Sequence, residues 1–245
     1  MEDQTHMIFV LSPGRCGTGY LAKMMATVPS VDARHEPQPD FASVAKDAQH
    51  DLSLARTFWT EKKLPAIRAL GPEVYFETSH VFAHGFADAL LDLGMPADVV
   101  GLSRSPRQTA LSLWRRRSIP GRTGRGLNYL LHPANEHNRL PLSHWENLDD
   151  YQLCYWHVLE IEARTEELLP RFEERGARTY RTSIGDLVDG PGFNDILDAM
   201  ELPDPRPEYE TRRDWRVNAN PAHYNEVWPE GDLNELEAGV WDAVR

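Results

Sequence analysis

The chain opens with a short apolar run, a glycine-rich turn and an amphipathic segment, and this order restricts the fold strongly. Residues 7–11 are continuously apolar, as expected of a buried parallel strand. Pro13, Gly14, Gly17 and Gly19 then predict a tight turn that leaves backbone N–H groups free. After the turn, apolar side chains recur on one helical face: Leu21, Met24, Met25 and Val28. Such a turn binds anions, because the free N–H groups and the helix dipole point at the same place.

The turn departs from the loop that binds ATP or GTP, G-x-x-x-x-G-K-[ST]. Tyr20, not lysine, follows Gly19, and no Ser or Thr stands where that loop binds Mg²⁺. The cation lies inside the turn, as Arg15. The sequence therefore predicts an anion site that needs no metal. The alternative is an ordinary glycine-rich connection between a strand and a helix.

A second candidate anion site follows near the end of the first half of the chain. Residues 99–102 predict a small buried strand, and Arg104 comes just after its C-terminal end, where ligands bind in open α/β sheets. Residues 108–114 predict a helix that carries Ser112. A guanidinium and a hydroxyl together suit the oxygens of a phosphate. The alternative is a surface arginine in an ion pair beside a routine helix serine.

Together these two motifs resemble sulfotransferases that use 3′-phosphoadenosine 5′-phosphosulfate (PAPS). Residues 12–21, SPGRCGTGYL, are similar to the 5′-phosphosulfate loop, in which a basic residue precedes a Gly-Thr pair by two positions. The family's 3′-phosphate signature is an arginine after a strand with a serine eight residues later, and Arg104 and Ser112 match it. The resemblance covers the first half of the chain well and the second half only in general pattern. It implies that the following residues contact the nucleotide: Gly14, Arg15, Cys16, Gly17, Thr18, Gly19, Tyr20, Arg104 and Ser112.

The resemblance also implies a late basic segment at the 3′-phosphate. Arg212, Arg213 and Arg216 could supply it, although the glycine-containing late motif of the family is not evident. Sulfuryl transfer requires in-line positioning and stabilisation of the leaving phosphate, by analogy with phosphoryl transfer. We expect Arg15, the loop N–H groups and the Thr18 hydroxyl to stabilise that charge. PAPS is then the co-substrate, PAP (adenosine 3′,5′-bisphosphate) the product, and no metal is required.

An alcohol acceptor requires a catalytic base. Some branches of the family place a glutamate on the strand after the first helix, which Glu36 matches. Others use a histidine in a Lys-Thr-His pattern, to which residues 78–80 are similar without the lysine. We favour Glu36 as the base, then His80, then His35. Each could instead be a hydrogen-bonded wall residue, and His35-Glu36 lacks the spacing of a zinc motif.

The remaining chain alternates predicted strands and helices, which indicates an α/β fold: one domain with a mostly parallel sheet covered by helices on both faces. We expect further strands at residues 74–78 and 178–182 and one just before residue 33. Expected helices carry apolar faces in residues 82–93, 149–172, 193–200 and 233–244. Two segments predict loops, the arginine-rich 115–141 and the irregular 203–230. The segment 115–141 is expected to be a flap that covers either the nucleotide or an acidic acceptor. The alternative is a solvated linker.

Composition favours a cytoplasmic enzyme. The 245 residues suffice for one large core, no apolar run reaches membrane-spanning length, and the polar N-terminus has no signal pattern. The two cysteines, Cys16 and Cys154, do not suggest a disulfide. A net charge of −12 argues against binding of nucleic acid or of anionic membranes.

These observations predict a sulfotransferase that moves a sulfuryl group from PAPS to a hydroxyl or amine of a small-molecule, sugar or peptide acceptor. One alternative is a kinase with a related loop, which would need Mg²⁺ and ATP. Another is a non-catalytic nucleotide-binding module that binds PAP and transfers nothing.

Overall fold

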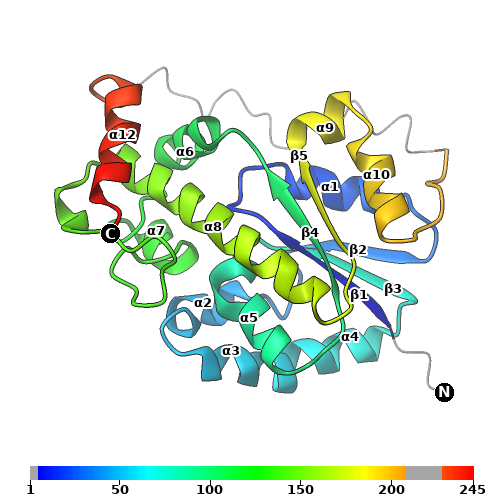
Figure 1. Cartoon of the computed structure of the whole chain (residues 1–245). Coiled ribbons are helices and arrows are strands. Elements are labelled where there is room, and N and C mark those ends of the chain that lie inside the picture. Colours follow the sequence, from blue (N-terminus) through cyan, green and yellow to red (C-terminus); the bar gives the residue numbers. More distant parts are fainter. Residues whose placement is uncertain (1–4, 208–227) are drawn as a thin grey trace.

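The computed structural model describes residues 5–207 and 228–245. Its centre is a five-stranded sheet in the order β2-β3-β1-β4-β5, with every pair of neighbouring strands parallel (Figure 1). The strands are β1 (His6–Leu11), β2 (Val31–His35), β3 (Val74–Thr78), β4 (Asp98–Ser103) and β5 (Thr179–Ser183). The predicted parallel α/β fold is therefore confirmed.

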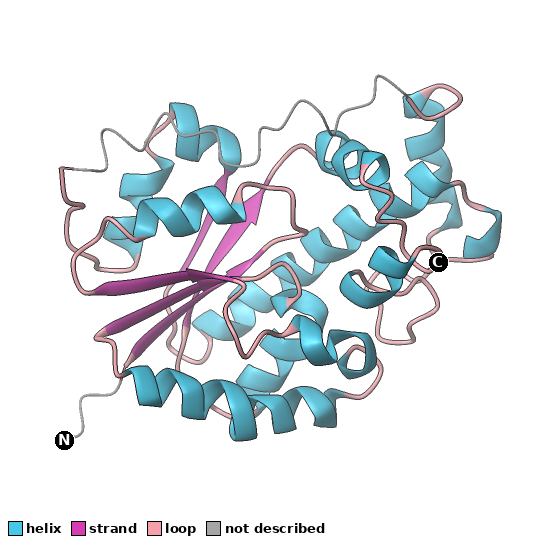
Figure 2. Cartoon of the chain, turned by 180° about the vertical axis from the view of Figure 1, so that it is seen from behind, coloured by secondary structure: helices cyan, strands magenta, loops and turns pink. Residues whose placement is uncertain are grey.

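Helices cover both faces of this sheet (Figure 2). One face carries α1 (Thr18–Met25), α9 (Ile184–Asp189) and α10 (Gly192–Ala199). The opposite face carries α2 (Ala42–Ala48), α3 (Leu52–Phe58), the π-helix η1 (Trp59–Lys63), α4 (Leu64–Leu70), the π-helix η2 (Phe82–Phe86), α5 (Ala87–Asp92), α6 (Pro106–Arg115) and α8 (Asp150–Glu173). The remaining helices are α7 (Gly124–Tyr129), the 3₁₀-helix η3 (Trp145–Asn147) and α12 (Leu233–Ala243), which packs on α8.

The unbroken apolar run of β1 follows from this two-sided cover. Successive side chains of a strand point to opposite faces, so a strand with helices on both sides has no solvent face. Phe9 belongs to the core on the face that carries α2, α5 and α8, whereas Ile8 and Val10 belong to the core on the face that carries α1 and α10. All three are fully buried.

The strand register brings the C-terminal ends of β1, β2, β3 and β4 to one edge of the sheet. Val10 and His35 both lie beside Thr78, and Leu11 lies beside Gly101. Because the strands are parallel, the segments after β1, β2, β3 and β4 all leave from the C-terminal edge of the sheet. This edge is where ligands bind in open α/β sheets.

Three segments differ from expectation. Residues 33–35 are expected from the sequence to follow a strand, but they belong to the edge strand β2 itself. On this strand Arg34 pairs with Asp32 at 2.9 Å. Residues 42–70 are largely helical, where no helix is predicted; they form short helices of seven residues or fewer, with the π-helix η1 between α3 and α4. Part of the predicted loop 115–141 folds as α7.

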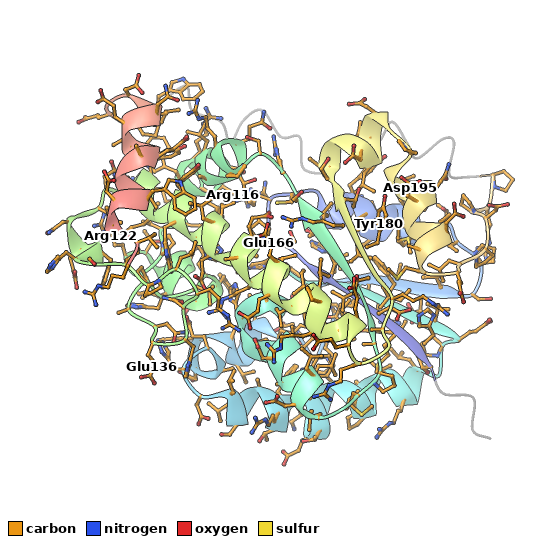
Figure 3. The ribbon with its side chains drawn as sticks, in the orientation of Figure 1. Arg116, Arg122, Glu136, Glu166, Tyr180 and Asp195 are labelled. Carbon is orange, nitrogen blue, oxygen red and sulfur yellow. The ribbon has the colours of Figure 1, made fainter. Side chains whose placement is uncertain are left out.

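Two of the labelled side chains in Figure 3 show how peripheral segments are fixed. Arg122 donates to Asp150 on α8 at 2.7 Å and to the Glu146 carbonyl at 3.0 Å. Tyr180 of β5 donates to Asp195 of α10 at 3.0 Å. At least Arg122 of the arginine-rich segment is thus engaged in structural contacts. Most of the predicted loop 203–230 lies outside the described residues.

The long helix predicted over 149–172 forms as α8, and a capping box explains where it begins. Asp149 accepts from the Gln152 backbone at 2.8 Å, and the Gln152 side chain accepts from the Asp149 backbone at 3.0 Å. Across the two described ranges, no helix combines the length and apolarity needed to cross a membrane.

Candidate active site

The glycine-rich turn forms a tight loop between β1 and α1. Gly14, Arg15 and Gly17 have φ angles of 76°, 58° and 92°, in the left-handed region. The Ser12 hydroxyl accepts from the Gly14 N–H at 3.1 Å, and α1 begins directly after Gly17. The first turn of a helix has N–H groups without intrahelical partners, so the loop can hold an anion through its backbone.

Two of the glycines with positive φ are also approached closely by side chains. A Cβ on Gly14 would lie 3.1 Å from His80 Cβ, and a Cβ on Gly17 would lie 2.3 Å from Ile184 Cδ1. The loop is therefore held between the segment after β3 and the start of α9. The first contact places the predicted anion loop against a predicted catalytic residue.

Arg15, Arg104 and Ser112 come together beside the loop. Arg15 Nε donates to Ser112 Oγ at 3.2 Å, although the two residues are 97 positions apart. Arg104 Nη1 donates to the Arg15 carbonyl at 3.3 Å, and Arg104 Nε donates to Gln108 Oε1 at 3.1 Å. Two guanidiniums and a hydroxyl at one place form a receptor for a multiply charged anion.

The second half of the loop is buried. Cys16 has no exposed surface, and Thr18 and Tyr20 are 7% and 6% exposed. The Cys16 thiol donates to the Gly14 carbonyl at 3.1 Å, and burial raises its pKa to about 11. A neutral, hydrogen-bonded thiol stabilises the turn and is not a nucleophile.

Two of the three candidate bases contact each other. His80 Nδ1 lies 2.6 Å from Glu36 Oε1, and this hydrogen bond lowers the pKa of the Glu36 carboxyl. An ionised carboxylate only accepts hydrogen bonds, so Nδ1 donates in this bond, and in the tautomer that this bond selects the lone pair is on Nε2. Glu36 reaches this position through a left-handed backbone, with φ 49°.

The third candidate, His35, is not part of this pair. Its Nδ1 lies 2.9 Å from the Thr78 hydroxyl, within the β2–β3 pairing. The structure thus brings Glu36 and His80 together at the loop and leaves His35 on the end of the edge strand.

A pocket of about 500 Å³ opens beside the pair. Glu36 and His80 both line it. The other lining residues come from the start of α2 and the segment before it, from the segment after β3, and from α7: Asp40, Ala42, Ser43, Ser79, Val81 and Tyr129. The volume is within the range of small-molecule sites. Because His80 also contacts the anion loop, the pocket and the loop share one wall. Nothing in the sequence singles out Asp40 or Ser43.

Two buried histidines lie behind His80. The rings of His80 and His84 are 6.4 Å apart, and those of His84 and His157 are 5.8 Å apart. Burial lowers the pKa of His157 to about 3 and that of His84 well below its usual range, so both rings are neutral. Within the described residues, His84 Nε2 and both nitrogens of His157 have no hydrogen-bond partner. Sequence reasoning missed both; only the four-residue spacing of His80 and His84 is visible there.

Two remaining expectations concern the late basic segment and metals. Arg212, Arg213 and Arg216 lie outside the described residues. In the part of the chain that the structure describes, no group of three or more His, Cys, Asp or Glu side chains is arranged to hold a metal ion.

Fold and site define a class: parallel α/β proteins with a glycine-rich anion loop at the carboxyl edge of the sheet. Two solved structures with this fold are sulfotransferases. The chain is similar to the sulfotransferase domain from the curacin biosynthetic pathway, with a TM-score of 0.58 and 16% identity over 90% of this chain and 82% of that chain. It is also similar to a sulfotransferase from Alicyclobacillus acidocaldarius, with a TM-score of 0.50 and 14% identity over 97% of this chain and 93% of that chain. No protein-family model and no curated protein sequence matches it. These likenesses concern the fold.

Proposed function

We propose that the chain is a sulfotransferase that transfers the sulfuryl group of PAPS to an acceptor hydroxyl or amine. The observation that carries this proposal is the convergence of Arg15, Arg104 and Ser112 on the loop after β1. A nucleotide with phosphate at both ends needs two anion receptors, and the chain has a backbone loop and an arginine–serine pair side by side. The fold shared with two sulfotransferase structures supports the same conclusion.

The two receptors have different tasks in this proposal. The loop, Arg15 and the Thr18 hydroxyl hold the 5′-phosphosulfate, and Arg104 with Ser112 holds the 3′-phosphate. Arg104 also donates to the Arg15 carbonyl, so the side chain that binds one end of the nucleotide orients the backbone that binds the other. A sulfonate carries less charge than a terminal phosphate, so the two guanidiniums suffice without Mg²⁺.

We further propose that His80, positioned by Glu36, is the catalytic base. The acceptor O–H transfers its proton to His80 Nε2 as its oxygen forms a bond to sulfur. The bond from sulfur to the 5′-phosphate oxygen breaks on the opposite side, and PAP leaves. Negative charge grows on that phosphate oxygen, where Arg15 stabilises it. The Glu36 carboxylate stabilises the imidazolium that forms, as the acidic member of a catalytic triad does.

The geometry changes the preference among the three candidate bases. Sequence reasoning favours Glu36, but an ionised carboxylate with a lowered pKa is a weaker base than an imidazole. Glu36 is therefore assigned the positioning role. His35 is assigned none, because its ring is hydrogen-bonded to Thr78.

The test is release of PAP from PAPS in the presence of a panel of phenols, sugars and hydroxyl-bearing peptides. The wild type should release PAP with at least one acceptor, and His80→Ala should not, whereas His35→Ala should retain turnover. Binding of PAP without release for any acceptor would indicate a non-catalytic module. Turnover of ATP that requires Mg²⁺ would indicate a kinase.

A further inference from the structure

The pocket beside Glu36 and His80 has an electrostatic character opposite to that of the nucleotide site. Arg15 and Arg104 give the loop side two positive charges. The pocket lining has two carboxylates, Glu36 and Asp40, and no lysine or arginine from the described chain. Donor and acceptor therefore meet at a boundary between a positive and a negative region.

The negative charge of the pocket is only partly compensated. The hydrogen bond from His80 lowers the pKa of Glu36 and keeps its carboxylate ionised at neutral pH. Burial lowers the pKa of Lys63, and Asp40 is one of the carboxylates whose negative charge opposes that lowering. Lys63, however, is 1% exposed and lies 2.9 Å from the buried Glu77, which already balances its charge. An anion in the pocket would thus meet uncompensated negative charge.

The lining of the pocket suits a ring compound. Tyr129 of α7 lines it and is 44% exposed, and its ring contacts no other aromatic ring in the described part of the chain. An exposed aromatic face beside small polar groups is a surface on which a flat ring can lie. Ser43 of α2 and Ser79, which follows β3, supply hydroxyls to the same lining.

Resting on the proposed function, we propose that the acceptor is a small hydroxyl-bearing ring compound that is cationic or neutral, and that anionic acceptors are excluded. The acceptor ring lies against Tyr129, its reacting hydroxyl faces His80, and a positive group, where present, lies near Asp40. This selects among the small-molecule, sugar and peptide acceptors that the sequence leaves open. It also argues against an acidic acceptor held by the arginine-rich segment 115–141.

Three phenols with the same ring and different charge test this proposal: tyramine (cationic), tyrosol (neutral) and 4-hydroxyphenylacetate (anionic). Binding to the PAP-saturated protein is measured by calorimetry, and kcat/KM is measured with PAPS. We expect tyramine to bind best and 4-hydroxyphenylacetate worst, with about tenfold or more between them.

Two variants test whether the preference for tyramine over 4-hydroxyphenylacetate arises in the pocket. Asp40→Asn removes a charge but keeps the acceptor oxygen that bonds the Ser43 N–H at 2.7 Å, so the start of α2 is preserved. It should reduce the ratio of tyramine to 4-hydroxyphenylacetate affinity several-fold while tyrosol changes little. Asp47→Asn removes an exposed charge from α2 outside the pocket and should leave the ratio unchanged.

Equal affinities, a preference for the anion, no binding of tyramine at millimolar concentration, or equal effects of the two variants would each overturn the inference. These results are separable from failure of the proposed function, because PAP binding by the same samples is measured first. A protein that binds and releases PAP but prefers 4-hydroxyphenylacetate keeps the function and loses the acceptor assignment. A protein that binds no PAP loses the function itself.

Discussion

His80 donates from Nδ1 to Glu36 Oε1 over 2.6 Å, and this bond joins segments that follow two neighbouring strands. Gly14 of the loop after β1 packs against the same histidine, and a Cβ on Gly14 would lie 3.1 Å from His80 Cβ. The three segments therefore fix one another, and a change in any of them should affect the others. This coupling is the basis of the first prediction.

Glu36→Gln should slow turnover by about 10²-fold or more while PAP affinity is unchanged, because the amide stabilises an imidazolium poorly and can favour the wrong tautomer of His80. Steady-state kinetics and PAP calorimetry on the same sample separate the two effects. His35→Ala is the control and should leave kcat near the wild-type value. Equal loss in both variants would contradict the assigned roles, as would a loss confined to KM.

Gly17→Ala should destabilise the protein by about 1–3 kcal/mol and weaken PAP binding, because the new Cβ is strained at φ 92° and overlaps Ile184. Urea denaturation measures the free energy of unfolding. Gly124→Ala is the matched control, since a Cβ there would meet no atom within 4 Å. Adding Ile184→Ala should relieve the overlap but not the strain from φ, so recovery should be partial; no recovery at all would contradict the contact.

The buried His157 predicts a pH dependence of stability. Its pKa is lowered from 6.5 to about 3, so between these values the unfolded chain binds a proton that the folded chain does not. Stability is then full above about pH 6.5 and falls as the pH falls, by up to about 1.4 kcal/mol per pH unit for this residue. In His157→Leu, the loss of unfolding free energy between pH 7.5 and pH 5 should be smaller by about 2 kcal/mol. The exposed His50→Leu should show the wild-type loss, and an unchanged loss in His157→Leu would contradict the prediction.

Because Lys63 and Glu77 form a buried ion pair, we expect a single substitution to lower the free energy of unfolding much more than the double substitution. Lys63→Met leaves the Glu77 carboxylate buried beside Tyr75 without its cation and should cost about 3–5 kcal/mol of unfolding free energy. Burial already raises the pKa of Glu77, so this variant should be less destabilised at low pH, where the carboxyl is protonated, and more as the pH rises.

The double variant Lys63→Met/Glu77→Gln should recover most of the loss, because no uncompensated charge remains. Lys62→Met, at an exposed neighbour on the same π-helix, should change stability little. A double variant as unstable as the single one would show that packing, not charge, holds this region.

Most of the sheet, and the position of Arg104 at the same sheet edge as the loop after β1, could be predicted from the sequence. The apolar runs of β1, β3 and β4 are strong signals because these strands are buried on both faces. The parallel order then places Arg15 and Arg104 at one edge, although their contact and the bond to Ser112 needed coordinates.

Glu36 and His80 are candidates from the sequence, but their contact and the pocket beside them could not be predicted, because these depend on backbone detail. Glu36 reaches His80 only through a left-handed conformation that favours glycine, and sequence gives no reason to expect it there. His157 lies on the apolar face of a helix where a histidine carries no signal of its own. Tyr129 enters the pocket because part of an expected loop folds as α7.

The central claim is that Arg104 recognises a 3′-phosphate beside the loop that holds the 5′ group. Calorimetry with PAP and with AMP, which lacks the 3′-phosphate, tests it most directly on the wild type, Arg104→Ala and the control Arg68→Ala on α4. We predict that the wild type and Arg68→Ala bind PAP about tenfold or more tightly than AMP, and that Arg104→Ala binds the two alike. Equal affinity of the wild type for PAP and AMP, or a PAP preference that survives Arg104→Ala, would contradict the account.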